Sequence, residues 1–165
     1  MKISGLKSGK GILSKCLKVF CLVVAVVAGM SGDAWGQLDL TIANNRSRTI
    51  SDNETYNNVT ISEGNRDSYI TIPNGATLTV NGNLTINAST SNNYNKYIDV
   101  QSGGTLIVKG DVTMAATDNN RKDCYIKING NSTVIIEGNI IMNGNNNRNY
   151  ILFAGNGTLN IGGTI

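Results

Sequence analysis

A six-residue phrase recurs four times in this chain at a nearly constant interval, and this repeat limits the possible folds more than any other feature. The phrase reads Thr, aliphatic, any residue, aliphatic, any residue, Gly; its starts are 28, 28 and 25 residues apart, and it occupies residues 77–82, 105–110, 133–138 and 158–163. A second phrase, which begins with Tyr-Ile, keeps the same interval at residues 69–72, 97–100, 125–128 and 150–153. Repeats of this length are typical of stacked architectures, in which each unit buries its apolar face against the next.

Within a repeat, apolar and polar residues alternate over short runs, which is the pattern of half-buried β-strands. The inward-facing positions of one repeat form three pairs, namely Ile70 with Ile72, Leu78 with Val80, and Leu84 with Ile86. Equivalent positions stay apolar in the later repeats, so equivalent side chains should stack on one another. The pattern predicts three short strands per repeat.

Two architectures can hold such strands. In an antiparallel meander the glycine turns would be hairpins, and Asn81-Gly82 is a strong hairpin signal. An odd number of strands per repeat would then reverse the chain direction at every repeat, and equivalent phrases would run antiparallel to one another. We therefore predict an all-β fold, a right-handed parallel β-helix (β-solenoid) of about four coils of about 28 residues with three short strands each.

Residues 1–36 have the composition of a signal peptide. Five lysines precede or border an apolar core at 19–30, and Ala34-Trp35-Gly36 places small residues before a cleavage point, which predicts Gln37 as the mature N-terminus. Twelve apolar residues are fewer than the roughly 20 that span a bilayer, although an uncleaved anchor is the alternative. We expect the protein to be secreted or exposed on the cell surface, with no membrane insertion of the mature segment.

The apparent basicity of the chain belongs to this leader. The whole chain has a formal net charge of +3, but removing residues 1–36 leaves nine basic and ten acidic residues. This balance gives no support for nucleic-acid binding. Cys124 is then the single mature thiol, which excludes an internal disulfide and favours an inert residue over intermolecular pairing.

The remaining chain divides into two parts. Residues 37–56 lie outside the repeat and are expected to form an N-terminal cap, and residues 57–165 carry the solenoid repeats. Because Ile165 aligns with Leu84, in the middle of a coil, the C-terminus is expected to be truncated. The segment between the second and third strands varies in length and is rich in Asn, as at 89–93 and 143–147, where stacked amides could form ladders.

Three sets of outward-facing residues are candidates for binding. The first is a column of tyrosines that offers either a stacking platform for glycans or ring-on-ring packing alone; its members are Tyr69, Tyr97, Tyr125 and Tyr150. The second is an apolar patch for a partner protein, formed by Ile107, Ile135 and Ile141. The third, a threonine column at Thr77, Thr105, Thr133 and Thr158, is interpreted as structural hydroxyl pairing.

Catalytic and metal sites have weak support in the sequence. The chain contains no His, so His-based triads and His metal ligands are absent. Asp99 is expected between Thr71 and Lys127 in its column, and Asp111 between two Asn residues, so no two acids meet as paired catalysis requires. We predict no catalytic residues, no metal and no cofactor. Lys109 and Glu137, one coil apart, are expected to form an exposed ion pair.

The phrase at residues 75–86, behind a leader peptide, resembles the β-helical repeats of large bacterial secreted and surface proteins. These include adhesins, autotransporter passenger domains and similar exported proteins of the Bacteroidetes, and the resemblance covers residues 57–165. It implies a bacterial surface or extracellular stalk and transfers no catalytic residues.

Together these features predict an exported, non-catalytic, adhesin-like β-solenoid segment. Its expected partners are extracellular glycans or host and cell-surface proteins, and its oligomeric state is left open. The alternative is a carbohydrate-binding or pectin-lyase-like β-helix whose active part lies outside these residues.

Overall fold

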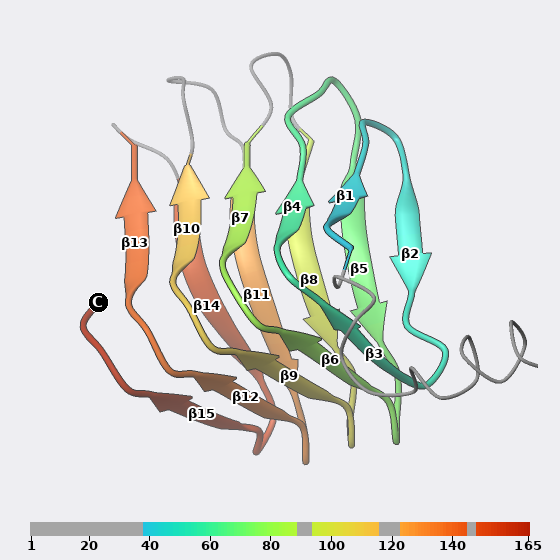
Figure 1. The fold of residues 1–165 in the computed structure, drawn as a ribbon, viewed down its shortest axis with the longest axis vertical. Coiled ribbons are helices and arrows are strands. Elements are labelled where there is room, and N and C mark those ends of the chain that lie inside the picture. Colours follow the sequence, from blue (N-terminus) through green and yellow to red (C-terminus); the bar gives the residue numbers. More distant parts are fainter. Residues whose placement is uncertain (1–37, 89–93, 116–122, 145–147) are drawn as a thin grey trace, which may run out of the picture. The chain divides into compact units, whose positions relative to one another are not determined.

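The computed structural model describes residues 38–88, 94–115, 123–144 and 148–165, and they form a three-sided stack of parallel β-sheets (Figure 1). Sheet A contains β1 (Leu40–Ile42), β4 (Val59–Ile61), β7 (Leu84–Asn87), β10 (Val112–Ala115) and β13 (Ile140–Asn143). Sheet B contains β2 (Ser47–Thr49), β5 (Ser68–Ile72), β8 (Lys96–Val100), β11 (Asp123–Asn129) and β14 (Arg148–Ala154). Sheet C contains β3 (Asn53–Tyr56), β6 (Thr77–Val80), β9 (Thr105–Val108), β12 (Thr133–Ile136) and β15 (Thr158–Ile161).

Successive passes of the chain run in the same direction, which confirms the parallel β-solenoid and shows that the hairpin alternative is wrong. Every strand pairing is parallel, and equivalent residues of the repeat are register partners: Leu78 pairs with Leu106, Leu106 with Val134, and Val134 with Leu159. Asn81-Gly82 is therefore a corner between β6 and β7 of one coil. Direct stacking of equivalent residues is what keeps the repeat phrases alike.

Each sheet holds five strands, so the expected count of about four coils is one short. The additional coil is β1–β3, whose residues carry neither repeat phrase. These strands nevertheless pair in register with β4, β5 and β6. Sequence comparison between repeats cannot find this coil, because strand pairing requires only backbone geometry and tolerates different side chains.

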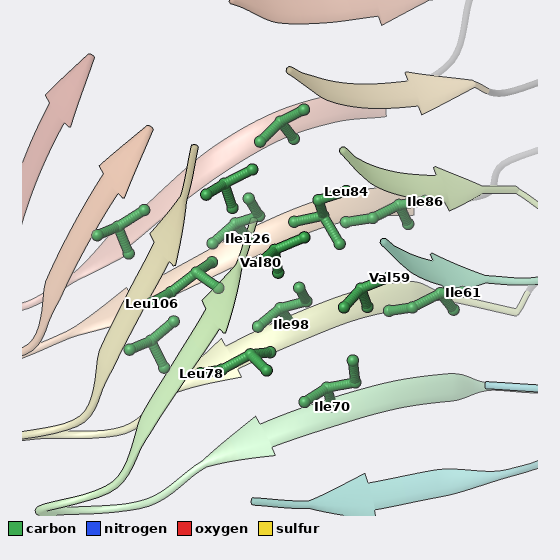
Figure 2. Close-up of a cluster of buried hydrophobic side chains, with 14 of the residues drawn as sticks. Val59, Ile61, Ile70, Leu78, Val80, Leu84, Ile86, Ile98, Leu106 and Ile126 are labelled. Carbon is green, nitrogen blue, oxygen red and sulfur yellow. The ribbon is translucent and has the colours of Figure 1, made fainter. Parts of the chain in front are cut away.

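The core lies between the three sheets and is built from the predicted inward columns. Figure 2 shows these aliphatic side chains pointing into the interior from facing strands, and Leu78, Leu106 and Ile98 are fully buried. In the last coil the same columns are more open: Phe153 is 51% exposed, whereas its register partner Ile128 is fully buried. Burial of aliphatic side chains contributes roughly 1.5–3 kcal/mol each, so the stacked columns are the main source of stability.

The corner between sheets C and A is narrow, and glycine is required there. A Cβ atom placed on Gly138 would lie 2.5 Å from the carbonyl oxygen of Gly110 in the neighbouring coil. The backbone hydrogen bond from Gly138 N to Gly110 O is 3.2 Å long. This close approach explains why the repeat phrase ends in Gly.

A ladder of Asp and Asn side chains follows this glycine along the same corner. In each coil the side-chain Oδ1 accepts a hydrogen bond from the backbone amide of the equivalent residue in the next coil, over 2.8–3.0 Å. The acceptors, in order, are Asp39, Asn58, Asn83, Asp111 and Asn139. We call this set the Asx ladder. It satisfies amides at a corner where the sheets have ended.

Candidate functional site

The four predicted tyrosines stand on the outer face of sheet B and stack as a continuous column, which we call the tyrosine ladder (Tyr69, Tyr97, Tyr125 and Tyr150). Ring centroids of neighbours are 4.8, 4.8 and 5.2 Å apart, and neighbouring planes are inclined by 8°, 1° and 2°. All four rings are partly buried. The spacing follows from the distance between coils in a parallel sheet, because the side chains occupy equivalent positions on neighbouring strands.

Carboxylates and an ion pair flank the tyrosine ladder. On one side the Tyr150 hydroxyl donates a 3.0 Å hydrogen bond to Asp123 Oδ2. On the other side Lys127 Nζ lies 3.4 Å from Asp99 Oδ1, which also accepts a 2.8 Å hydrogen bond from Asn129 Nδ2. The outer face of sheet B therefore combines stacked aromatic rings with one ion pair and hydrogen-bonded carboxylates.

Burial within the stack raises the pKa of Tyr97 and of Tyr125 to about 12, and neighbouring tyrosines and carboxylates act in the same direction. Both phenols are therefore protonated hydrogen-bond donors at neutral pH. Neighbouring rings cover much of each face within the column, so the ladder offers mainly ring edges and hydroxyl groups to solvent. This geometry suits hydrogen bonding along the ladder better than flat stacking of a sugar on each ring.

The three predicted isoleucines do not form one patch. Ile107 and Ile135 are register partners on the outer face of sheet C, and both are partly buried. Ile141 is 37% exposed, but it lies in β13 of sheet A, where its register partner is Thr113. The structure therefore brings the first two together and places the third on a different face.

The outer face of sheet C carries no charged side chain at its strand positions in the described residues. The outward positions of its five strands are occupied by Asn53, Thr55, Thr77, Thr79, Thr105, Ile107, Thr133, Ile135, Thr158 and Asn160. The predicted threonine column is thus in register beside the isoleucine pair. The result is an uncharged strip of hydroxyl and methyl groups.

The acidic residues considered in the sequence analysis, Asp99 and Asp111, make structural contacts with neighbouring coils. Asp111 belongs to the Asx ladder and accepts 2.8 and 3.0 Å hydrogen bonds from the backbone and side-chain nitrogens of Asn139. The predicted pair Lys109–Glu137 is not within ion-pair distance; both side chains are exposed, and the ion pairs of the described residues are Arg48–Glu54 and Lys127–Asp99. Within the described residues no group of three acidic or cysteine side chains could hold a metal ion.

A buried lysine was not predicted. Lys96 is fully buried in an inward column of sheet B, where its register partners are Ser68 and Cys124. Its Nζ donates hydrogen bonds to the Arg66 carbonyl oxygen and, over 3.0 Å, to Ser68 Oγ. Desolvation lowers the pKa of Lys96, and Asp67 and Cys124 oppose this effect. Cys124 is also fully buried, and burial raises the pKa of its thiol to about 12.

A polar cluster at the first coil was also missed. Arg48 and Glu54 occupy inward columns, opposite Ile70 and Leu78, and Arg48 Nη2 lies 2.6 Å from Glu54 Oε2. Tyr56 OH donates a 2.7 Å hydrogen bond to the same oxygen and accepts one of 2.8 Å from Arg48. Burial acts to raise the pKa of Glu54, but hydrogen bonds from Tyr56, Arg48 and Ser51 outweigh it and hold the pKa below its ordinary value.

The Asn-rich segment at 89–93 and most of that at 143–147, where an amide ladder was expected, lie outside the described residues.

In the part of the chain that is described, no helix is long and apolar enough to cross a bilayer. Comparison with protein-family models, with curated proteins and with solved structures found no match.

Proposed function

We propose that this protein is an exported, non-catalytic β-solenoid that extends from or is released at a bacterial surface and contributes to adhesion. Residues 1–36 supply the export signal in this proposal, and the parallel stack supplies a stiff scaffold. Each coil adds about 4.8 Å of length while keeping its outer positions aligned. Such a scaffold displays the same chemical groups repeatedly along one direction.

The observation that carries the proposal is the unbroken register of all three sheets over five strands. The acidic residues Asp99, Asp111 and Asp123 are each engaged in contacts that hold neighbouring coils together. Reactive carboxylates in glycosidases stand as a pair across a substrate. The arrangement here supports a framework role.

Within this proposal, the uncharged outer strip of sheet C is the adhesive surface. Ile107 and Ile135 stand beside the threonine column and offer methyl groups next to hydroxyls. An uncharged polysaccharide presents the same mixture of hydroxyl and apolar C–H groups, and binding would not require the removal of hydration from fixed charges. Extracellular glycans are therefore the proposed partner class.

Export is tested in the source organism with antibodies raised against residues 37–165. We expect the antigen on intact cells or in the medium, with a mature N-terminus at Gln37 and loss of the cell signal after protease treatment of whole cells. Antigen that stays in the cytoplasm with residues 1–36 attached would contradict the export proposal.

Adhesion is tested separately with two matched double variants of residues 37–165. The first variant, I107K/I135K, puts two charges on sheet C; the control, T85K/T113K, puts two charges at equivalent outward positions of sheet A. On an array of uncharged polysaccharides, wild type and the control should be retained and I107K/I135K should be lost. Equal retention of both variants, or no retention of wild type, would remove sheet C from the proposal.

A further inference from the structure

The tyrosine ladder is also a reactive arrangement. The rings of Tyr97 and Tyr125 are 4.8 Å apart between centroids and parallel within 1°, and the backbones that carry them are in register. Tyr69 and Tyr150 continue the stack on either side. Among the described aromatic rings, stacked pairs are confined to these four residues. Rotation about the Cβ–Cγ bonds would turn the edges of neighbouring rings toward each other, and the two strands would then move closer as the ring carbons bond.

We propose that the tyrosine ladder is a site of oxidative cross-linking, at which a one-electron oxidant joins tyrosines of neighbouring coils as dityrosine. The oxidant class is a peroxidase with hydrogen peroxide. The product is a covalent bond between two coils that are otherwise held by hydrogen bonds and packing. This inference does not depend on the adhesive role proposed above.

The chemistry balances without any group from the protein other than the two phenols. Each tyrosine loses one electron and its phenolic proton, which gives two neutral phenoxyl radicals. The radicals couple through ring carbons next to the phenolic oxygens, and the hydrogens on the two coupled carbons move as protons to the oxygens and restore the aromatic rings. Hydrogen peroxide accepts the two electrons and two protons and leaves as two molecules of water.

Two features of the structure favour coupling within the ladder. The rings are partly exposed, so electrons can pass to an oxidant at the surface. Asp123 accepts the hydrogen bond of the Tyr150 hydroxyl over 3.0 Å and can take its proton as the electron leaves. Tyr97 and Tyr125 are protonated at neutral pH, so each of these rings also loses its phenolic proton, to solvent, as its electron leaves.

Two double variants of residues 37–165, each with two ladder tyrosines, test the proposal. Y69F/Y150F keeps Tyr97 and Tyr125, which are neighbours; Y69F/Y125F keeps Tyr97 and Tyr150, which are separated by one coil. Phenylalanine preserves the ring stack but cannot form a phenoxyl radical, so both variants should fold, as circular dichroism will verify. Tyr56 and Tyr94 are unchanged in both variants and provide an equal background.

Each variant is treated in dilute solution with peroxidase and hydrogen peroxide, the monomer is isolated, and tryptic peptides are analysed by mass spectrometry. For Y69F/Y150F we expect peptide 97–109 joined to peptide 123–127, at the sum of their masses less two hydrogen atoms, together with dityrosine fluorescence of the monomer. For Y69F/Y125F we expect no peptide 97–109 joined to peptide 149–165 in the monomer, and only the background dityrosine of Tyr56 and Tyr94. Equal dityrosine in the two monomers, or none in either, would overturn the proposal.

Discussion

Lys96 and Ser68 are stacked in adjacent coils, and the lysine Nζ donates a 3.0 Å hydrogen bond to the serine hydroxyl at a position with no exposure to solvent. A protonated lysine in an inward column is costly unless hydrogen bonds replace its hydration. This pair therefore links the charge state of one side chain to the stability of the whole stack.

The stability of the protein should depend on the protonation of Lys96. The pKa of a buried lysine is lowered in the folded state, whereas the unfolded chain keeps the ordinary value of 10.5. Between these two pKa values the unfolded state binds more protons, so the free energy of unfolding should rise as the pH rises through this window. K96M lacks this pH-dependent contribution. The free energy of unfolding of wild type minus that of K96M, measured by urea unfolding at several pH values, should therefore increase as the pH rises.

The matched control for this experiment is K109M, which removes an exposed lysine. Ionisation of Tyr97 and Tyr125 is common to all three proteins, so it cancels in the differences. Cys124 interacts electrostatically with Lys96 and would not cancel, so all three proteins also carry C124A. A wild-type-minus-K96M difference that stayed constant over the window would show that burial does not perturb Lys96.

Adding a methyl group at Gly138 should destabilise the corner of the solenoid. The new Cβ atom would collide with the backbone of Gly110, and neither strand can move without disturbing its sheet. We expect G138A to lose about 1–3 kcal/mol of unfolding free energy. In G130A the nearest atom to the new Cβ is 3.9 Å away, so the change should stay within about 1 kcal/mol. Chemical denaturation of both variants distinguishes the sites, and equal losses would argue against the close approach.

The Asx ladder predicts that the stability of the protein depends on the acceptor atom Oδ1 of Asp111. Alanine removes the acceptor for two nitrogens of Asn139, whereas asparagine keeps Oδ1 in place. D111A should therefore be destabilised by about 1–3 kcal/mol relative to wild type, and D111N should remain within about 1 kcal/mol. Thermal unfolding of the two variants provides the measurement. If D111N lost as much stability as D111A, the negative charge would be the stabilising feature.

Cys124 should be nearly unreactive in the folded protein. Its thiol is fully buried and its pKa is raised to about 12, so very little thiolate is available at neutral pH. We expect alkylation by iodoacetamide to be slower than in urea by a factor on the order of a hundred or more. A cysteine placed at an outward position, in the double variant T113C/C124A, should react rapidly in the folded state. Fast alkylation of Cys124 in the native protein would mean that the stack opens readily.

The repeat predicted the part of the structure in which each coil copies the previous one. The columns that contain Leu78 and Leu106 were recognisable because parallel in-register stacking places equivalent residues in the same environment. The stacking of Tyr97 on Tyr125 followed from the same geometry. The coil formed by residues 40–56 was not recognised, because backbone pairing preserves no side-chain pattern there.

Two of the polar features were missed although the sequence carried a signal for each. Lys96 lies two residues before Ile98 and so has the phase of an inward residue, which was a usable signal for its burial. The Asx ladder also had a signal, since an Asp or Asn directly precedes the first inward residue of sheet A in every coil. Lys109 and Glu137 share a column as predicted, but exposed side chains gain little from pairing and lose rotamer freedom, and they do not meet.

The polar cluster of Arg48, Glu54 and Tyr56 has a consequence for self-association. Among the described residues, β1, β2 and β3 are the edge strands of their sheets, and such an edge could template the growth of a fibre if another solenoid stacked on it. Such stacking would force the guanidinium and carboxylate groups against an aliphatic layer, where their hydration could not be replaced. Charged side chains at two inward positions therefore disfavour fibril-like assembly through these strands.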